Sequence, residues 1–219
     1  MSPLWKLKGT PLEIGNYRGI TLLNVDGKAY VTLLLHRVRK HLQAGLLDAQ
    51  HGFMPNRGTA DCLFVMRRLV ETAREYRAEL HAAFVDFKQA FDSVNHAVLW
   101  EVLKARGVHP KLVNMISDLY NGSRARVTAH GCTSDWFDLM TGVRQGCPLS
   151  PTLFNVFIDF IVRQVIAACA EQGVHCFTMA FCFHNSIVPM GEDANVTVLM
   201  LLYEAYVFCF CYMRTTWFC

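Results

Sequence analysis

The sequence predicts an α+β domain, because stretches with helically spaced apolar residues alternate with short apolar runs typical of strands. Of the 219 residues, 53 % are hydrophobic and 18 % are charged. This balance supplies a buried core and excludes an intrinsically disordered chain. The elements follow one another as two helices, a strand, two short helices, a strand pair and a long helix, which is the order of an α+β domain.

The first two predicted helices are amphipathic and carry basic outer faces. From Tyr30 to Gln43 apolar residues recur at helical spacing, with Arg39 and Lys40 on the opposite face. Thr59 is the expected N-cap of the second helix, and one apolar stripe runs along it: Cys62, Met66, Leu69, Ala73, Tyr76 and Leu80. Residues 1–80 hold 12 basic and 7 acidic side chains, a balance of +5, whereas the whole chain has 21 − 18 = +3. The excess of positive charge therefore lies in the N-terminal part of the chain.

A short apolar run from His81 to Phe87 is interrupted only by Asp86, which predicts a buried strand ending at this aspartate. Gly107 and Asn121-Gly122 are expected to close the two helices that follow. The remaining predicted elements are helices at about 95–106 and 110–120, a strand pair at 124–129 and 136–140, a Gly/Pro loop at 142–151, and a helix from Ser150 to about 168.

The last 51 residues differ in composition from the rest of the chain. Residues 169–219 hold six of the nine cysteines and one basic against four acidic side chains. The odd cysteine count and the absence of a signal-peptide core predict reduced thiols and an intracellular protein, in nucleus or cytoplasm. Residues 196–213 have Glu204 as their only charge, so they fit a membrane-spanning segment at the short limit of length or, equally well by residue type, a buried strand pair. A membrane-associated protein is thus one alternative, although we expect no membrane partner.

Three separate motifs follow one another along the chain. Asn16 to Leu23 reads N-Y-R-G-I-T-L-L, Gln50 to Asp61 reads Q-H-G-F-M-P-N-R-G-T-A-D, and Gly142 to Pro151 reads G-V-R-Q-G-C-P-L-S-P. Together with the strand that ends at Asp86, they make the chain resemble the reverse transcriptase domain of non-LTR (LINE-type) retrotransposons over roughly residues 11–168. Gly19, Thr21 and Met54 depart from the family's proline, serine and arginine.

The resemblance implies a right-hand polymerase with fingers and part of the palm in residues 1–168. Residues 169–219 then form a divergent Cys-rich tail, or a degenerate palm hairpin, and no thumb is expected. The implied reaction is RNA-directed DNA synthesis from an RNA template, a DNA primer and deoxynucleotides, with Mg²⁺ and without a small-molecule cofactor. Such two-metal chemistry stabilises the attacking and leaving oxygens together.

The resemblance also implies roles for individual residues. Asp86 is the expected catalytic carboxylate and metal ligand, with the backbone carbonyl of Phe87 as a further ligand. Phe91 matches the aromatic position under the nucleotide sugar, although it also fits ordinary core. The expected nucleotide contacts are Arg18, Lys28, Arg57, Gln145 and Gly146, and the expected nucleic-acid contacts are Arg39 and Lys40. For the basic residues the competing interpretation is a solvated surface charge, and for Gln145-Gly146 it is a simple loop.

The sequence departs from the family at the second carboxylate motif. In place of Y-A-D-D stands Tyr203-Glu204-Ala205-Tyr206. Glu204 is displaced by one position, and on a strand that shift turns a side chain to the opposite face. We therefore predict a catalytically inactive member of the family, in which Mg²⁺ binding is weak or absent. A non-catalytic nucleic-acid-binding fragment that keeps the basic residues is the other alternative.

Overall fold

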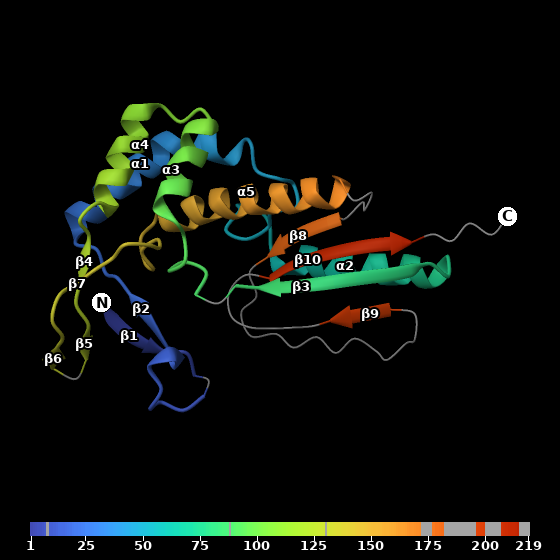
Figure 1. Cartoon of the computed structure of the whole chain (residues 1–219), viewed down its shortest axis with the longest axis horizontal. Coiled ribbons are helices and arrows are strands. Elements are labelled where there is room, and N and C mark those ends of the chain that lie inside the picture. Colours follow the sequence, from blue (N-terminus) through green and yellow to red (C-terminus); the bar gives the residue numbers. More distant parts are fainter. Residues whose placement is uncertain are drawn as a thin grey trace. The chain divides into compact units, whose positions relative to one another are not determined.

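The computed structural model describes residues 1–7, 9–87, 89–129, 131–171, 177–181, 196–199 and 207–214. The chain divides into two compact units, one formed by residues 1–45 and 91–157 and the other by residues 46–90 and 158–219. Within the described residues the protein mixes helices and strands, as the sequence predicts (Figure 1). Each unit is described separately below.

Three helices form the core of the first unit: α1 (Val25–Gln43), α3 (His96–Ala105) and α4 (Pro110–Tyr120). Helix α4 packs against both α1 and α3. The predicted bounds of α3 and α4 are confirmed to within a residue. Helix α1 begins five residues before its predicted start at Tyr30, because the Asn24 side chain accepts a hydrogen bond from the Gly27 N–H at 2.9 Å and caps the helix there.

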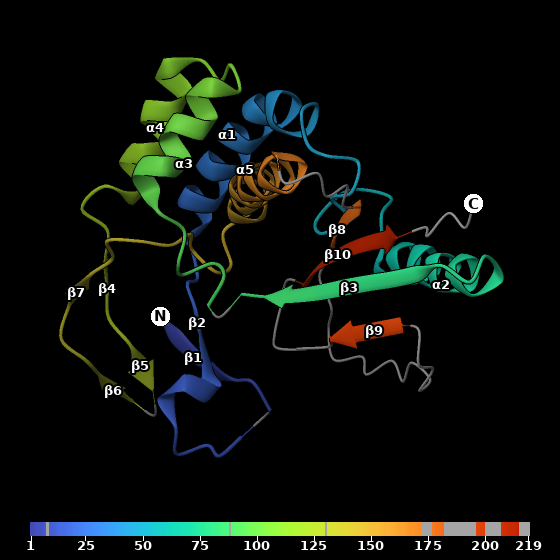
Figure 2. The same ribbon diagram turned by 45° about the vertical axis from the view of Figure 1, so that its right-hand side comes forward.

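The strands of the first unit are short. β1 (Ser2–Trp5) and β2 (Tyr17–Ile20) pair antiparallel, and the 3₁₀ helix η1 (Ile14–Asn16) precedes β2. The predicted strand pair is present as two short ladders of one hairpin, which Figures 1 and 2 show as a ribbon beside β1. The ladders are β4 (Arg124–Ala125) with β7 (Phe137–Asp138), and β5 (Thr128–Ala129) with β6 (Cys132–Thr133).

The second unit contains α2 (Thr59–Glu75), and two predictions about this helix are wrong. Its N-cap is Gly58 rather than Thr59, because the Asp61 carboxylate reaches back and accepts a hydrogen bond from the Gly58 N–H at 2.7 Å. The helix also ends before the predicted stripe is complete. Tyr76 is 71 % exposed, and Leu80 is buried in the following strand.

The second unit also contains a four-stranded sheet. Its order is β8 (Phe177–Phe181), β10 (Val207–Arg214), β3 (Glu79–Asp86) and β9 (Val196–Leu199). β10 runs antiparallel to β8 and β3, whereas β9 runs parallel to β3. In β3, Leu80, Ala82 and Phe84 are buried while His81, Ala83 and Val85 are exposed, so one face of the strand meets the core. Helix α2 neighbours β3 and β8 (Figure 2).

Helix α5 (Ser150–Glu171) begins at the predicted residue. By length and composition it is the one described helix that could cross a membrane, and 39 % of its most apolar window is buried inside the protein. Its first turns contribute several core residues, among them Leu153, Phe154 and Val156. The other membrane candidate is residues 196–213, and its described parts, residues 196–199 and 207–213, lie in strands rather than in a helix.

Candidate functional site

The Gly/Pro loop at residues 142–151 is fixed by backbone hydrogen bonds within the first unit. The Val143 N–H donates to the Phe91 carbonyl at 2.7 Å, and the Thr21 N–H donates to the Gln145 carbonyl at 2.8 Å. This second hydrogen bond links two of the three sequence motifs, the one at residues 16–23 and the one at residues 142–151. The turn that follows β3, which contains Phe91, is held to the same loop.

Two glycines allow this close approach. Gly142 has a φ of +90° and Gly146 a φ of +102°, a region that L side chains rarely adopt. A Cβ on Gly142 would lie 2.8 Å from the Asp92 backbone, and a Cβ on Gly146 would lie 2.8 Å from the Thr21 carbonyl oxygen. The sequence suggested that Gly146 gives room to a nucleotide. In this structure the Thr21 backbone occupies that side of the glycine.

The Gln145 side chain is paired with a carboxylate that the sequence reasoning did not single out. Its amide Nε2 donates to the Asp92 carboxylate, at 3.2 Å to the nearer oxygen. Partial burial raises the pKa of Asp92, while the hydrogen bond from Gln145 and the charge of Lys6 act in the opposite direction. The hydrogen bond to Asp92 holds the side-chain amide of Gln145, a predicted nucleotide contact, in one orientation.

The aromatic residue predicted under the sugar packs inside the first unit. The Phe91 ring is stacked on Phe154 of α5, with ring centroids 4.9 Å apart and an interplanar angle of 13°. Phe91 keeps partial exposure. This stacking fixes the ring's orientation whichever of its two predicted roles applies.

The basic residues of the first unit differ in exposure. Arg18 lies in β2 and is partly buried, whereas Lys28 is exposed in the first turn of α1. Arg39 and Lys40 are exposed near the end of α1, opposite the buried face formed by Val31, Leu34, Val38 and Leu42. The predicted basic outer face of this helix is therefore present.

The second unit holds the predicted catalytic position. Asp86 is the last residue of β3, where its backbone pairs with Val207 of β10. The Asp86 side chain and residues 203–206 lie outside the described parts of the structure. Among the residues that are described, no group of three or more His, Cys, Asp or Glu side chains could hold a metal ion.

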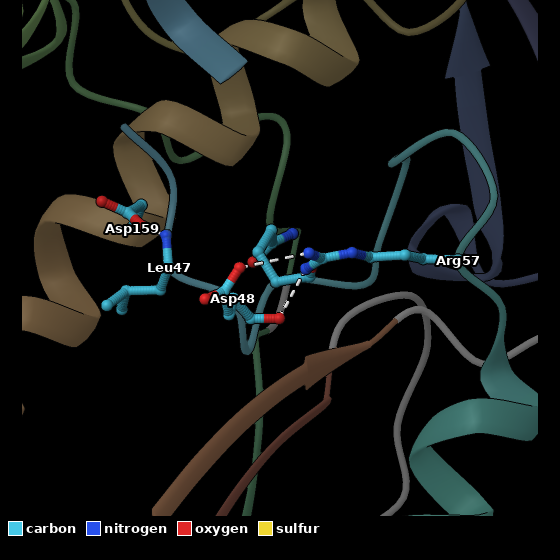
Figure 3. A network of polar contacts seen from close by, with 5 residues as sticks. Leu47, Asp48, Arg57 and Asp159 are labelled. Carbon is cyan, nitrogen blue, oxygen red and sulfur yellow. Dashed lines mark hydrogen bonds and ion pairs between the residues drawn. The ribbon is translucent and has the colours of Figure 1, made fainter. Parts of the chain in front are cut away.

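Arg57 closes a loop in the second unit (Figure 3). Its guanidinium donates to the Asp48 and Gln50 carbonyls, the latter at 2.9 Å, and contacts the Asp48 carboxylate at 3.3 Å. Burial lowers the pKa of the adjacent His51, and the charge of Arg57 lowers it further, against the opposing charge of Asp61. Arg57 therefore organises the second motif, and its contact with a triphosphate stays a prediction.

Asp159 of α5 anchors the start of this loop and was not predicted from the sequence. The buried carboxylate accepts a hydrogen bond from the Leu47 backbone N–H at 2.7 Å and another from Arg163 Nε at 2.7 Å. Figure 3 shows Asp159 beside Leu47, which directly precedes Asp48, a contact of Arg57. The available signal was an acid within an apolar helix, because a buried carboxylate needs partners.

Comparison with known proteins identifies the class. Residues 6–182 match the family described as reverse transcriptase (RNA-dependent DNA polymerase). This match covers most of the chain, so the chain belongs to the reverse transcriptase family.

The relatives narrow the class to reverse transcriptases of non-LTR retrotransposons. The chain is 32 % identical, over 78 % of its length, to an RNA-directed DNA polymerase from mobile element jockey of Drosophila funebris. It is 31 % identical over 68 % of its length to a retrovirus-related Pol polyprotein from a type-1 retrotransposable element of Nasonia vitripennis. It is 29 % identical over 65 % to a corresponding type-2 polyprotein of Drosophila melanogaster.

The chain spans 19 % of the length of the first of these relatives and 14 % of each of the other two. A solved structure of apo telomerase from Candida tropicalis, truncated from its C-terminal domain, aligns with 84 % of this chain and 33 % of its own, with 14 % identity and a TM-score of 0.46.

Proposed function

We propose that this chain is the fingers and palm portion of an RNA-directed DNA polymerase from a non-LTR retrotransposon, and that it binds nucleic acid without joining nucleotides. Residues 1–168 supply fingers and palm in this proposal, and residues 169–219 are a divergent tail that carries the altered second carboxylate motif. One observation carries the proposal. Asp86 ends β3 within the family match, whereas the position of the second carboxylate motif reads Tyr203-Glu204-Ala205-Tyr206.

The chemistry of nucleotidyl transfer explains why that replacement abolishes activity. Two divalent ions about 3.5–4 Å apart must stabilise the attacking and leaving oxygens, and hard cations such as Mg²⁺ need several carboxylate oxygens. The donors in this sequence do not fit such a pair. Asp86 with the Phe87 carbonyl supplies one charged ligand, and Glu204 stands one position away from the expected carboxylates. A single acid leaves two dications without compensating charge.

The residual function proposed here is binding of an RNA template and DNA primer through their phosphates. Arg39 and Lys40 support it, because both are exposed on α1 within the segment whose net charge is +5. Contacts of this kind release counterions, so affinity falls as salt rises and depends little on base sequence. Lys28, exposed on the same helix, and Arg18 are the proposed contacts to a triphosphate.

Fluorescence anisotropy with a labelled RNA–DNA template–primer across a salt series tests this proposal. The double variant Arg39→Ala, Lys40→Ala is expected to flatten the slope of log K against log salt by up to about 1.4–1.8, at roughly 0.7–0.9 per phosphate contact. The matched control is Lys104→Ala, Lys111→Ala, which removes two charges from α3 and α4. An unchanged slope in the α1 variant would show that this face is only solvated.

Asp86→Asn provides a second arm of the same experiment. Removing a negative charge should leave binding unchanged or make it slightly tighter. Binding that collapses in this variant would mean that a metal ion occupies the site, which would contradict the proposed inactivity.

A further inference from the structure

The hairpin between α4 and the Gly/Pro loop is irregular at one point. Ala125 pairs with Phe137, and Thr128 pairs with Thr133. Two residues, 126 and 127, therefore lie between the ladders on one side, against three residues, 134–136, on the other. The extra residue makes a β-bulge, a feature that re-aims side chains and sharpens the local twist.

Two arginines stack on one tryptophan at this bulge. The Arg126 guanidinium lies 5.0 Å and the Arg124 guanidinium 5.9 Å from the centre of the Trp136 ring. Arg124 also contacts the Asp138 carboxylate at 3.4 Å, between side chains that are more than half exposed. Within the described residues the Arg126 guanidinium has no carboxylate partner. A guanidinium held by cation–π attraction, without a carboxylate, keeps N–H donors for other partners.

A cleft of about 310 Å³ opens beside this stack, within the first unit. Three arginines line it, Arg124, Arg126 and Arg144, together with Trp136, and no carboxylate residue is among its lining residues. Arg144 is held rigidly, since its guanidinium donates to the Leu119 carbonyl and to the Ser123 hydroxyl. One anchored and two exposed arginines around an open cleft concentrate positive potential there.

We propose that this cleft binds the phosphate backbone of a single-stranded nucleic acid, as a site separate from the basic face of α1. Arginine forks match phosphate oxygens in geometry and charge. The tryptophan holds Arg126 in place for that contact, and aromatic side chains among cations are the usual composition of single-strand sites. The inference rests on the proposed nucleic-acid-binding function.

Anisotropy titration of a short fluorescein-labelled single-stranded RNA across a salt series tests the cleft. Arg124→Ala with Arg126→Ala should lower the salt slope by about 1.4, at roughly 0.7 per phosphate of a single strand. Trp136→Leu should weaken binding about tenfold without changing net charge, since the ring no longer holds Arg126 in place for its phosphate contact. Trp136→Phe should restore most of the affinity. Lys104→Ala with Lys111→Ala is the matched control.

Photocrosslinking gives a readout that needs no substitution. RNA containing 4-thiouridine, irradiated with the unaltered chain, should mark the tryptic peptide of residues 127–144, which includes Trp136. Inorganic triphosphate should compete only weakly, because the proposed occupant is a strand rather than a free phosphate chain. A single-stranded DNA of the same sequence should bind comparably, because the contacts are to phosphates.

The outcomes separate this inference from the function it rests on. If the unaltered chain binds no nucleic acid at all, the proposed function fails. The proposed site in the cleft is overturned if the chain binds RNA but the arginine variant has the same salt slope as the lysine control. It is also overturned if RNA does not crosslink to the peptide of residues 127–144. Efficient competition by triphosphate would overturn the assignment to a strand.

Discussion

Replacing Asp159 with alanine is expected to destabilise the fold by about 2–3 kcal/mol. The side chain is fully buried, and it holds the backbone of Leu47 and the Nε of Arg163, each at 2.7 Å. Losing the acceptor leaves a part-buried backbone N–H without a partner, which costs about 2 kcal/mol. The ion pair adds about 0.5–1 kcal/mol, because the Arg163 side chain is 47 % exposed and can turn to water.

Urea unfolding followed by far-UV circular dichroism measures this cost, with two variants to divide it. Asp159→Asn keeps an oxygen for the Leu47 N–H and should cost about 1 kcal/mol, whereas Arg163→Ala removes the ion pair but keeps the carboxylate for Leu47 and should cost less than about 1 kcal/mol. The reasoning would be refuted by Asp159→Ala lying within about 0.5 kcal/mol of the unaltered chain. If Arg163→Ala lowers the free energy of unfolding as much as Asp159→Ala does, the ion pair rather than the hydrogen bond to Leu47 accounts for the stabilisation.

Three further substitutions test local features. Gly146→Ala should cost about 2–3 kcal/mol through its positive φ and the clash with Thr21, clearly more than Gly107→Ala, where φ is also positive but nothing lies within 4 Å; equal thermal shifts would contradict this. Because the pKa of Asp92 is raised, the folded state binds its proton more tightly, so stability falls as pH rises above about 3.8. The free energy of unfolding of Asp92→Asn should therefore rise relative to that of the unaltered chain across this pH range. A difference between the two that does not change with pH would contradict this. The pKa of His51 is lowered, so its contribution to stability is lost as pH falls below about 6.5. The unfolding midpoint of His51→Gln should therefore depend less on pH in this range than that of the unaltered chain. Parallel pH profiles of the two proteins would show that His51 does not cause the loss.

Helices with strong terminal signals were the most predictable part of the fold. α3 has Asn95 as its N-cap and Gly107, at a φ of +76°, after its end, and α4 starts at Pro110. These signals are local, so sequence alone places them. The end of α2 was mispredicted because the helical spacing continues to Leu80, whereas Arg77, at a φ of +50°, turns the chain into β3.

The site was less predictable because its contacts join distant parts of the sequence. Gln145 is 53 residues from Asp92 in the chain, and the loop backbone at Gly146 packs against Thr21. The motif predicts nucleotide contacts at Gln145 and Gly146, but it does not reveal Asp92 and Thr21, which lie against them. The residue types were therefore predictable and the contacts of their side chains were not.

Primer extension on an RNA template annealed to a DNA primer, with deoxynucleotides and Mg²⁺ or Mn²⁺, tests the central claim most directly. The chain should yield no extended primer above the level of its Asp86→Asn variant, because one strand-end carboxylate cannot position two metal ions. Extension by the unaltered chain that Asp86→Asn abolishes would contradict the proposed inactivity.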